Sequence, residues 1–341
     1  MYYVGLDLGL KKTAACIVDE DDKIIRQANL DSEPETIALW LHDQKLSIKR
    51  IGIESGMLHE HIYFGLVKAG LPAIVINSAD SRAFLKSKIN KTDKSDAHGI
   101  ARMMRMRHYK EVYVKTEESQ RQRALLASRK LLHAKMRDTE THIRGIIRQF
   151  GFKIGVTTRA KFEARVRELV QHDADLLASV EPMLAFQRAA REQFNTVTKR
   201  ILVVVRECPI CQILMTCPGV GPIGALMFKT TIDTPTRFKN AKAVGAAIGL
   251  TPKRWESGET QIMGRISKVG DAGLRATLYE GAQSFLSQNK RPCWLHTWAQ
   301  ELKEKKGHGK AVVALARKIA MILYVLWIEW RPFRWDDQPV A

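Results

Sequence analysis

Two aspartates stand three residues apart in a strongly basic segment, NKTDKSDAHGIARMMRMR, at positions 90–107. If this segment is helical, Asp93 and Asp96 share one face, because residues three apart are neighbours on a helix. Two further acids end apolar, strand-like runs, Asp7 in GLDLG and Glu54 in GIESG. Ligands of an α/β sheet gather at the carboxyl ends of strands, so we expect the four carboxylates to converge.

Four carboxylates in one place raise one another's pKa unless a cation neutralises them. Mg²⁺ and Mn²⁺ favour oxygen ligands, and two such ions can clamp both oxygens of a phosphoryl displacement. The set therefore predicts a divalent-metal site for phosphoryl transfer. Each acid alone has a plainer interpretation, since Asp93 could cap a helix, Asp96 could be a favourable first-turn charge, and Asp7 could be a turn residue.

The whole chain shares this basic character. Its 341 residues include 55 Lys and Arg against 36 Asp and Glu, which gives a formal net charge of +19 spread along the sequence. A polyanionic partner is the natural explanation, and nucleic acid is the commonest polyanion. An acidic membrane surface is the alternative, but no basic amphipathic helix or signal peptide is evident. The odd number of cysteines, five, favours a reducing cytoplasm.

The first third of the chain predicts a mixed α/β sheet. Three adjacent strands are expected in MYYVGLDLGL, KKTAACIVDE and KIIRQANL, followed by a helix in EPETIALWLHDQKL. A strand in IKRIGIES, a helix in HIYFGLVKAG and a strand in LPAIVINS continue the pattern.

The middle third predicts long helices. Apolar residues recur at steps near three and four, as in a coiled-coil seam, at Leu125, Leu132, Met136, Ile143, Ile146 and Phe150. A second helical stretch is expected over 161–205, interrupted at Pro182. The last third predicts short helices, glycine-rich turns and a final helix over 310–330. Its apolar run at 319–330 is shorter than the roughly 20 residues that span a bilayer, so we expect a buried helix.

The ordered motifs GLDLG, GIESG and KTDKSDA resemble the DEDD catalytic domain of the IS-one-ten family of insertion-sequence transposases. The stretch from CPGVGPIGAL to LRATLYEGA resembles the same family's C-terminal transposase domain, so the resemblance covers both ends of the chain. It implies a ribonuclease-H-like (RuvC-like) domain at 1–112, a helical coiled-coil dimerisation region at 113–206 and a mainly α transposase domain at 207–341. Mapped by motif, the metal-binding tetrad is Asp7, Glu54, Asp93 and Asp96.

The resemblance also singles out Ser257 in WESGE, because the serine of this Ser-Gly pair is the family's nucleophile and becomes covalently joined to DNA. Taken alone, a Ser-Gly pair is an ordinary loop. Nearby cations would lower the energy of a serine alkoxide and stabilise a pentacovalent phosphate. Glu256 departs from the neutral polar residue expected beside the serine, and its role is open.

The function implied is that of an insertion-sequence transposase. It would catalyse RNA-guided, metal-dependent cleavage, exchange and religation of DNA strands through a phosphoserine-type intermediate, with Mg²⁺ or Mn²⁺ as cofactor. The carboxylate site and Ser257 would act together across protomers. The implied partners are donor and target DNA, a structured non-coding guide (bridge) RNA and further copies of the chain, as a dimer and as a tetramer in the synaptic complex. No membrane is implied, and the location is the bacterial cytoplasm, at the nucleoid.

Cations and glycines that could hold a nucleic-acid backbone complete the predicted site. The turns PGVGP and KVGDAGLR could present backbone N–H groups to phosphates, although ordinary turns and helix caps would look the same. Four late tryptophans could stack bases, but their helical spacing favours core packing. The predicted contacts are Lys91, Lys94, Arg102, Arg129, Lys130, Arg144, Arg148, Gly219, Gly221, Lys253, Arg254, Arg265, Lys268 and Arg275.

Three other functions fit part of the pattern. A structure-selective nuclease resembling a junction resolvase would use the four carboxylates and water, and would not need Ser257. An actin-like sugar kinase would explain GLDLGLKKT, but its second Asp-Gly and its Gly-Gly motif are missing from the sequence. An architectural nucleic-acid binder would explain the charge and the helical arm, but not the ordered carboxylates.

Overall fold

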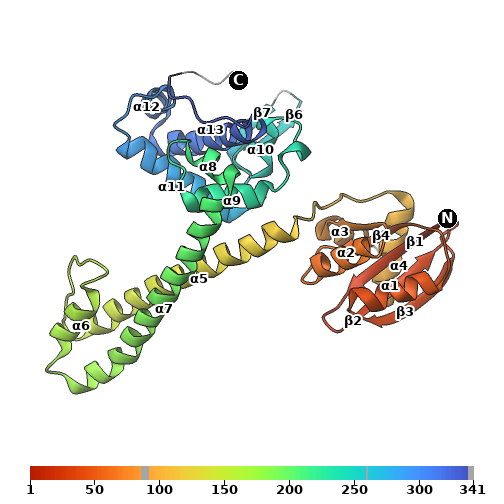
Figure 1. Ribbon diagram of the computed structural model, residues 1–341, viewed down its shortest axis with the longest axis horizontal. Helices are drawn as coiled ribbons and strands as arrows, with labels where there is room; N and C mark the ends of the chain where they lie inside the picture. Colours follow the sequence, from red (N-terminus) through yellow and green to blue (C-terminus); the bar gives the residue numbers. More distant parts are fainter. Residues whose placement is uncertain (86–91, 259, 337–341) are drawn as a thin grey trace. The chain divides into compact units, whose positions relative to one another are not determined.

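The computed structural model describes residues 1–85, 92–258 and 260–336 (Figure 1). The chain forms two compact units, Met1–Val114 and Lys115–Ala341. Each unit has its own hydrophobic core. The predicted division into three regions at 112 and 206 stays a prediction.

The first unit is built on a five-stranded mixed sheet of order β3-β2-β1-β4-β5. Strands β1, β2 and β3 are antiparallel, whereas β4 and β5 run parallel to β1. The mixed sheet predicted from the sequence is confirmed, with each of its strands at the expected motif. The strands are β1 (Tyr2–Leu8), β2 (Lys12–Val18), β3 (Ile24–Asp31), β4 (Ile48–Glu54) and β5 (Ala73–Ile76).

Helices cover both faces of this sheet. Helices α1 (Pro34–Asp43) and α2 (His59–Lys68) pack on the face that contains Val4 and Leu6. Helix α4 (Asp93–Met106) packs on the opposite face, which contains Tyr3. This division follows from the alternation of side chains along a strand. A further helix, α3 (Ser78–Leu85), was not predicted from the sequence.

Helix α4 lies directly against the backbone of β1 because the strand has a glycine at the crossing point. A Cβ atom added to Gly5 would lie 2.0 Å from the carbonyl oxygen of Ala97 and 2.4 Å from the nitrogen of Ala101. These are backbone atoms, which cannot move aside without shifting the helix. On β4, a Cβ at Gly52 would lie 2.8 Å from side-chain carbons of Ile100 and Met104. The two glycines therefore fix how closely α4 approaches the sheet.

Gly5→Ala is expected to lower the free energy of unfolding of the first unit by about 3 kcal/mol, because the added methyl overpacks a closed contact. Urea denaturation followed by circular dichroism measures this change. Gly56→Ala is the matched control, since its nearest atom would be 4.0 Å away. An unfolding midpoint for Gly5→Ala equal to that of the control would contradict the close approach.

The second unit begins with a helical hairpin made of α5 (Glu117–Gln149), α6 (Phe162–Val170) and α7 (Ala174–Glu207), with α5 and α7 side by side (Figure 1). The pair is antiparallel, and Arg129 in the first half of α5 bonds Thr198 in the second half of α7. Leu126, Ile143 and Ile147 are the buried apolar residues of α5, whereas Phe150 is 58% exposed. Phe150 was thus wrongly assigned to the seam, and the coiled coil itself stays a prediction.

The predicted interruption at Pro182 is wrong. The break between helices falls at residues 171–173, where Asp173 caps α7 by accepting a hydrogen bond from the N–H of Leu176 at 2.9 Å. Pro182 lies inside the continuous helix. Val180 and Leu184 flank the proline and are fully buried, and their burial offsets the one backbone hydrogen bond that a proline removes.

The remainder of the second unit is mainly helical, as predicted, but it contains a β-hairpin that was not predicted. The hairpin strands β6 (Pro252–Ser257) and β7 (Thr260–Ile266) form a separate two-stranded sheet. The helices are α8 (Pro209–Met215), α9 (Pro222–Ile232), η1 (Pro235–Arg237, 3₁₀), α10 (Ala241–Ala247), α11 (Ala272–Gln288), α12 (Trp294–Lys306) and α13 (His308–Ile328).

Helix α13 is the central core element of this unit. Its length and composition would allow it to cross a membrane, but 61% of its most apolar window is buried inside the protein. It packs against α10, α11 and α12. The prediction of a buried final helix over 310–330 is confirmed, with its bounds shifted by two residues.

Candidate active sites

The first unit places two of the predicted acids next to each other. The parallel register pairs Gly5 with Gly52 and Leu6 with Ile53, so Asp7 and Glu54 follow as neighbours at the carboxyl ends of β1 and β4. Alternation along the strands puts both acids on the face that carries the two glycines, which is the face covered by α4. The sequence prediction that these strand ends meet is therefore supported by the register.

Helix α4 brings its first turn to the same end of the sheet. The start of β4 is close to the end of α4, where Arg50 Nη2 donates to the carbonyl of Arg105 at 3.4 Å. The helix therefore runs opposite to the strand, and its first turn lies toward the end that carries Glu54. Thr92 and Ser95 form a capping box at this turn, in which the Ser95 N–H donates to the Thr92 hydroxyl at 3.2 Å. Asp96 is only 8% exposed.

Glu54 is held by a residue that the sequence did not single out. The Ser81 hydroxyl donates to Glu54 Oε2 at 2.8 Å. Ser81 belongs to α3 and is fully buried, so its hydroxyl has a fixed position. A hydrogen bond to a carboxylate of this kind orients a metal ligand in many metal sites. A serine in DSRAF carries no signal in the sequence, because its partner is 27 residues earlier.

The donor set suits a hard divalent cation, although its members are not gathered as a finished shell. Asp7, Glu54, Asp93 and Asp96 supply only carboxylate oxygens, which Mg²⁺ and Mn²⁺ prefer. Within 1–85, 92–258 and 260–336, no three His, Cys, Asp or Glu side chains are grouped so that they could hold one ion. Asp93 is exposed at the first position of α4, so its side chain faces solvent. The four residues therefore fit a divalent metal in their chemistry, and Asp7 and Glu54 also lie on the same face of the sheet.

Some of the cations that follow the acids on α4 form ion pairs within the first unit. Arg102 Nε lies 2.8 Å from a carboxylate oxygen of Asp22, and Arg105 Nε and His98 Nε2 are within 4 Å of the same carboxylate. Asp22 occupies a left-handed position, φ 70°, in the turn before β3. Arg102 thus has a structural ion pair. Its predicted DNA contact stays a prediction, as does that of the exposed Lys94, and Lys91 lies outside the described residues.

Ser257 is the last residue of β6, at the tip of the hairpin. It pairs with Thr260, and the following Gly258 has φ 55°, which suits a tight turn. Both Ser257 and Gly258 are exposed. Because alternate residues of a strand point to opposite faces, Glu256 points away from Ser257 and shares its face with Arg254. The acid beside the predicted nucleophile therefore does not face the same side as the serine hydroxyl.

The turn KVGDAGLR is tied down by its own side chains. Asp271 caps α11 by accepting from the Leu274 N–H at 2.8 Å, and it pairs with Arg123 Nη2 at 2.5 Å. Burial raises the pKa of Asp271, but the Arg123 hydrogen bond and the backbone N–H groups outweigh burial and lower it below its ordinary value. Arg275 Nη1 donates to the carbonyls of Ile248, Val269 and Gly270. The predicted phosphate contact of Arg275 stays a prediction beside this structural role.

The turn PGVGP joins α8 to α9, as expected. Gly219 has φ 78°, and a Cβ there would lie 2.6 Å from the carbonyl oxygen of Gly281. This glycine is therefore required for close packing on α11. Gly221 is the N-cap of α9. Contacts of the two glycines with phosphate stay predictions.

Some of the cations predicted to contact nucleic acid on α5 and near the β6–β7 hairpin interact with other side chains of the protein, and others are exposed. Arg129 lies over the Phe194 ring at 4.7 Å, and Arg144 pairs with Glu140 at 2.9 Å. Lys130 and Arg148 are exposed, as are Lys253 and Arg254 on β6 and Arg265 and Lys268 on and after β7. Whether these groups bind nucleic acid stays a prediction.

Comparison with known proteins finds transposase families in both the N-terminal and the C-terminal part of the chain. Residues 4–152 match a transposase family of the IS110 DEDD type, and residues 211–298 match the family described as Transposase IS116/IS110/IS902. The transposase for insertion sequence element IS1111A of Coxiella burnetii is 26% identical over 338 residues, covering 97% of this chain and 91% of the relative. The transposase for insertion sequence element IS1328 of Yersinia enterocolitica is 25% identical over 250 residues, covering 72% and 73%.

The two matches carry separate motif sets and follow the order in which the two units occur along the chain. One contains Asp7, Glu54, Asp93 and Asp96, and the other contains Ser257. Transposases of the DEDD type generally use divalent metal ions, which accords with the oxygen donors on β1, β4 and α4. The chain is therefore similar in both its N-terminal and C-terminal regions to DEDD transposases of the IS110, IS116 and IS902 type, and it is a DNA transposase.

Proposed function

We propose that this transposase exchanges DNA strands through a covalent intermediate on Ser257, guided by RNA. The observation that carries the proposal is the exposed position of Ser257 at the tip of β6, next to Gly258. A phosphate can approach the hydroxyl there without displacing protein. Lys253, earlier on the same strand, is exposed and favours the negative charge that develops on the phosphate.

Attack of Ser257 Oγ on the scissile phosphorus forms a P–Oγ bond and breaks the P–O bond to the departing strand. The departing oxygen takes up a proton and becomes a hydroxyl. In the second half of the reaction, a hydroxyl of another strand attacks the same phosphorus, and the P–Oγ bond breaks. Each step replaces one phosphoester with another, so strand exchange needs no external energy source.

Asp7, Glu54, Asp93 and Asp96 would hold Mg²⁺ or Mn²⁺, which when bound would polarise the scissile phosphate. Around this position the chain's own residues maintain the geometry. Ser81 orients Glu54, and the capping box at Thr92 fixes the turn that carries Asp93 and Asp96. The carboxylates and Ser257 act on the same phosphate, contributed by different protomers of a dimer or tetramer.

Sequence specificity would reside mainly in a structured guide RNA, which pairs with donor and target DNA. The protein would then recognise backbone and shape, a role that suits its large excess of Lys and Arg. The exposed cations Lys94, Lys130, Arg148, Lys253 and Arg254 are the candidate backbone contacts. We place the reaction in the bacterial cytoplasm, at the nucleoid.

Ser81→Ala is expected to raise the Mg²⁺ concentration for half-maximal cleavage by about tenfold, because Glu54 loses the donor that orients it. Cleavage measured across a Mg²⁺ titration checks this, and excess Mg²⁺ should restore most of the rate. Ser32→Ala is the matched control, since its buried hydroxyl bonds Thr13 and the Gly9 carbonyl rather than a carboxylate. An unchanged titration in Ser81→Ala would remove Ser81 from the site.

Covalent trapping tests the proposed function. The full chain is incubated with Mg²⁺, the RNA transcribed beside its gene, and labelled donor and target DNA, and is then run on a denaturing gel. A protein–DNA adduct, mapped by peptide mass to the segment that contains Ser257, would support the proposal. Cleaved DNA with no adduct would instead show that water is the nucleophile and that the enzyme is a metal-dependent nuclease.

A further inference from the structure

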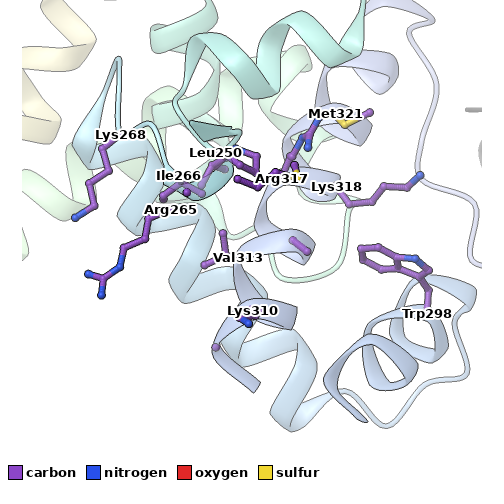
Figure 2. A pocket seen from close by; sticks show the side chains of 15 residues that line it. Leu250, Arg265, Ile266, Lys268, Trp298, Lys310, Val313, Arg317, Lys318 and Met321 are labelled. Carbon is purple, nitrogen blue, oxygen red and sulfur yellow. The ribbon is translucent and has the colours of Figure 1, made fainter. Parts of the chain in front are cut away.

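A large cavity lies beside the β6–β7 hairpin. Its volume is about 950 Å³, within the roughly 300–1,000 Å³ range of sites that enclose a small molecule. Its walls come mainly from β7, α12 and α13, all in the second unit. Figure 2 shows the Trp298 ring on the opposite side of the cavity from Ile266 and Val313. The cavity therefore offers an aromatic face and an apolar wall to a flat ligand.

The charged residues around this cavity are all cations. Five of its 15 lining residues are Lys or Arg, and the other ten are apolar residues, glycines or Trp298. In the part of the chain that the structure describes, none of the five is paired with a carboxylate within 4 Å. The five are Arg265, Lys268, Lys310, Arg317 and Lys318.

Arg317 is the cation of this lining whose side chain is most closely packed into the protein. Its Nε atom is buried and, among the residues with described positions, has no hydrogen-bond partner. The side chain is held against α10, because a Cβ added to Gly245 would lie 3.3 Å from both its Cγ and its Nε. A buried guanidinium N–H without a partner is unfavourable, and a phosphate oxygen would satisfy it.

We propose that this cavity binds one unpaired nucleotide of the DNA strand, with the base against Trp298 and the phosphate on Arg317 and neighbouring lysines. A paired base is covered by its neighbours, so only an unstacked base can present its face to an aromatic side chain. A second copy of this basic chain would bring like charges to the same surface. The occupant is a DNA strand because the cavity is lined by the strand β7 that pairs with the end of β6 at Ser257, whose proposed substrate is DNA.

The position of the cavity gives this nucleotide a place in the reaction, and this step rests on the proposed role of Ser257. Thr260 pairs with Ser257, and the cavity is lined by Met263 to Ile266 of the same strand. At about 3.3 Å per strand residue, the cavity begins roughly 10 Å and ends roughly 20 Å from the tip. Stacked nucleotides are about 3.4 Å apart, so the unpaired base lies about three to six nucleotides from the scissile phosphate. Its capture would hold the cut strand open for exchange.

The proposal is tested by binding, without catalysis. The full chain carrying Ser257→Ala is titrated, without Mg²⁺, into a fluorescein-labelled DNA duplex with one bulged thymidine, and into the fully paired duplex. Anisotropy should show about tenfold tighter binding to the bulged duplex. Trp298→Ala should abolish this preference and leave the affinity for paired DNA within about twofold. Trp330→Ala is the matched control, because Trp330 is 57% exposed and is not among the lining residues, and it should keep the preference.

Two further measurements separate the possible occupants. Arg317→Met retains the stem of the side chain and should weaken binding of the bulged duplex, with a salt dependence reduced by about one ion. The same bulge in an RNA duplex should give no preference. The proposal is overturned if the chain prefers the RNA bulge. It is also overturned if Trp298→Ala changes the oligomeric state while the preference for bulged DNA persists. If the Ser257→Ala chain with an unchanged cavity binds bulged and paired DNA equally, the proposal is also overturned. This holds even if the wild-type chain forms the Ser257 adduct in the trapping experiment.

Discussion

Ser257→Ala is expected to abolish the protein–DNA adduct and to reduce strand exchange by at least about 1,000-fold. Substitution removes the only atom that forms the covalent bond, and loss of a nucleophile typically removes catalysis to this extent or more. Stability should be unchanged, because Ser257 is exposed at the hairpin tip and makes no buried contact. The measurements are adduct yield on a denaturing gel and joint-molecule formation with labelled strands.

Thr260→Ala is the matched control, since Thr260 is the exposed partner of Ser257 across the hairpin. It removes a hydroxyl from the same tip, and it should retain both the adduct and exchange within a few-fold. If Ser257→Ala cleaves DNA as fast as the wild type while Thr260→Ala also does so, the serine mechanism is excluded. The carboxylate site would then cut DNA with water.

Asp7→Asn is expected to reduce cleavage by roughly 1,000-fold while the chain still binds DNA. The substitution keeps the size of the side chain but removes a charged oxygen ligand from the shared end of β1 and β4. Phosphoryl transfer depends on charge stabilisation at the metal, and loss of one such electrostatic group commonly lowers the rate by 100- to 1,000-fold. Single-turnover cleavage of labelled DNA gives the rate, and anisotropy gives the affinity.

Asp80→Asn provides the comparison, because it removes one negative charge from an exposed position of α3 in the same unit. Its cleavage rate should match that of the wild type. Since an asparagine could also raise DNA affinity by removing repulsion, rates are compared at saturating DNA. A full cleavage rate in Asp7→Asn would show that the carboxylate end of the sheet is not the catalytic metal site.

The sheet and its acids could be predicted from the sequence because they obey local rules. Strands that end at Asp7 and Glu54 show strong apolar runs, and parallel neighbours necessarily bring their carboxyl ends together. The β6–β7 hairpin has no such signal. Nearly every residue in both strands is exposed, so neither face has the apolar alternation that marks a half-buried strand.

Contacts between distant parts of the chain could not be predicted from the sequence. Arg102 was predicted to be a DNA contact, but its ion pair with Asp22 joins positions 80 residues apart. The bond from Ser81 to Glu54 likewise depends on how α3 returns to the end of β4. The cavity beside Trp298 depends on three elements that meet only after the second unit has folded. The spacing of residues along the chain indicates which side chains share one face of a helix or strand. It does not determine which distant helices and strands come into contact.

The two units also differ in how far apart in the sequence their core residues lie, and this affects the order in which they become active. The sheet unit closes within residues 1–114, so it can fold while later segments are still being made. The core of the second unit joins Leu126 to Phe333, about two hundred positions later. Contacts so distant in sequence form slowly, since a long loop must close first. During synthesis we therefore expect the carboxylates to be assembled well before the hairpin serine, so that the acids are in place before the chain can join strands.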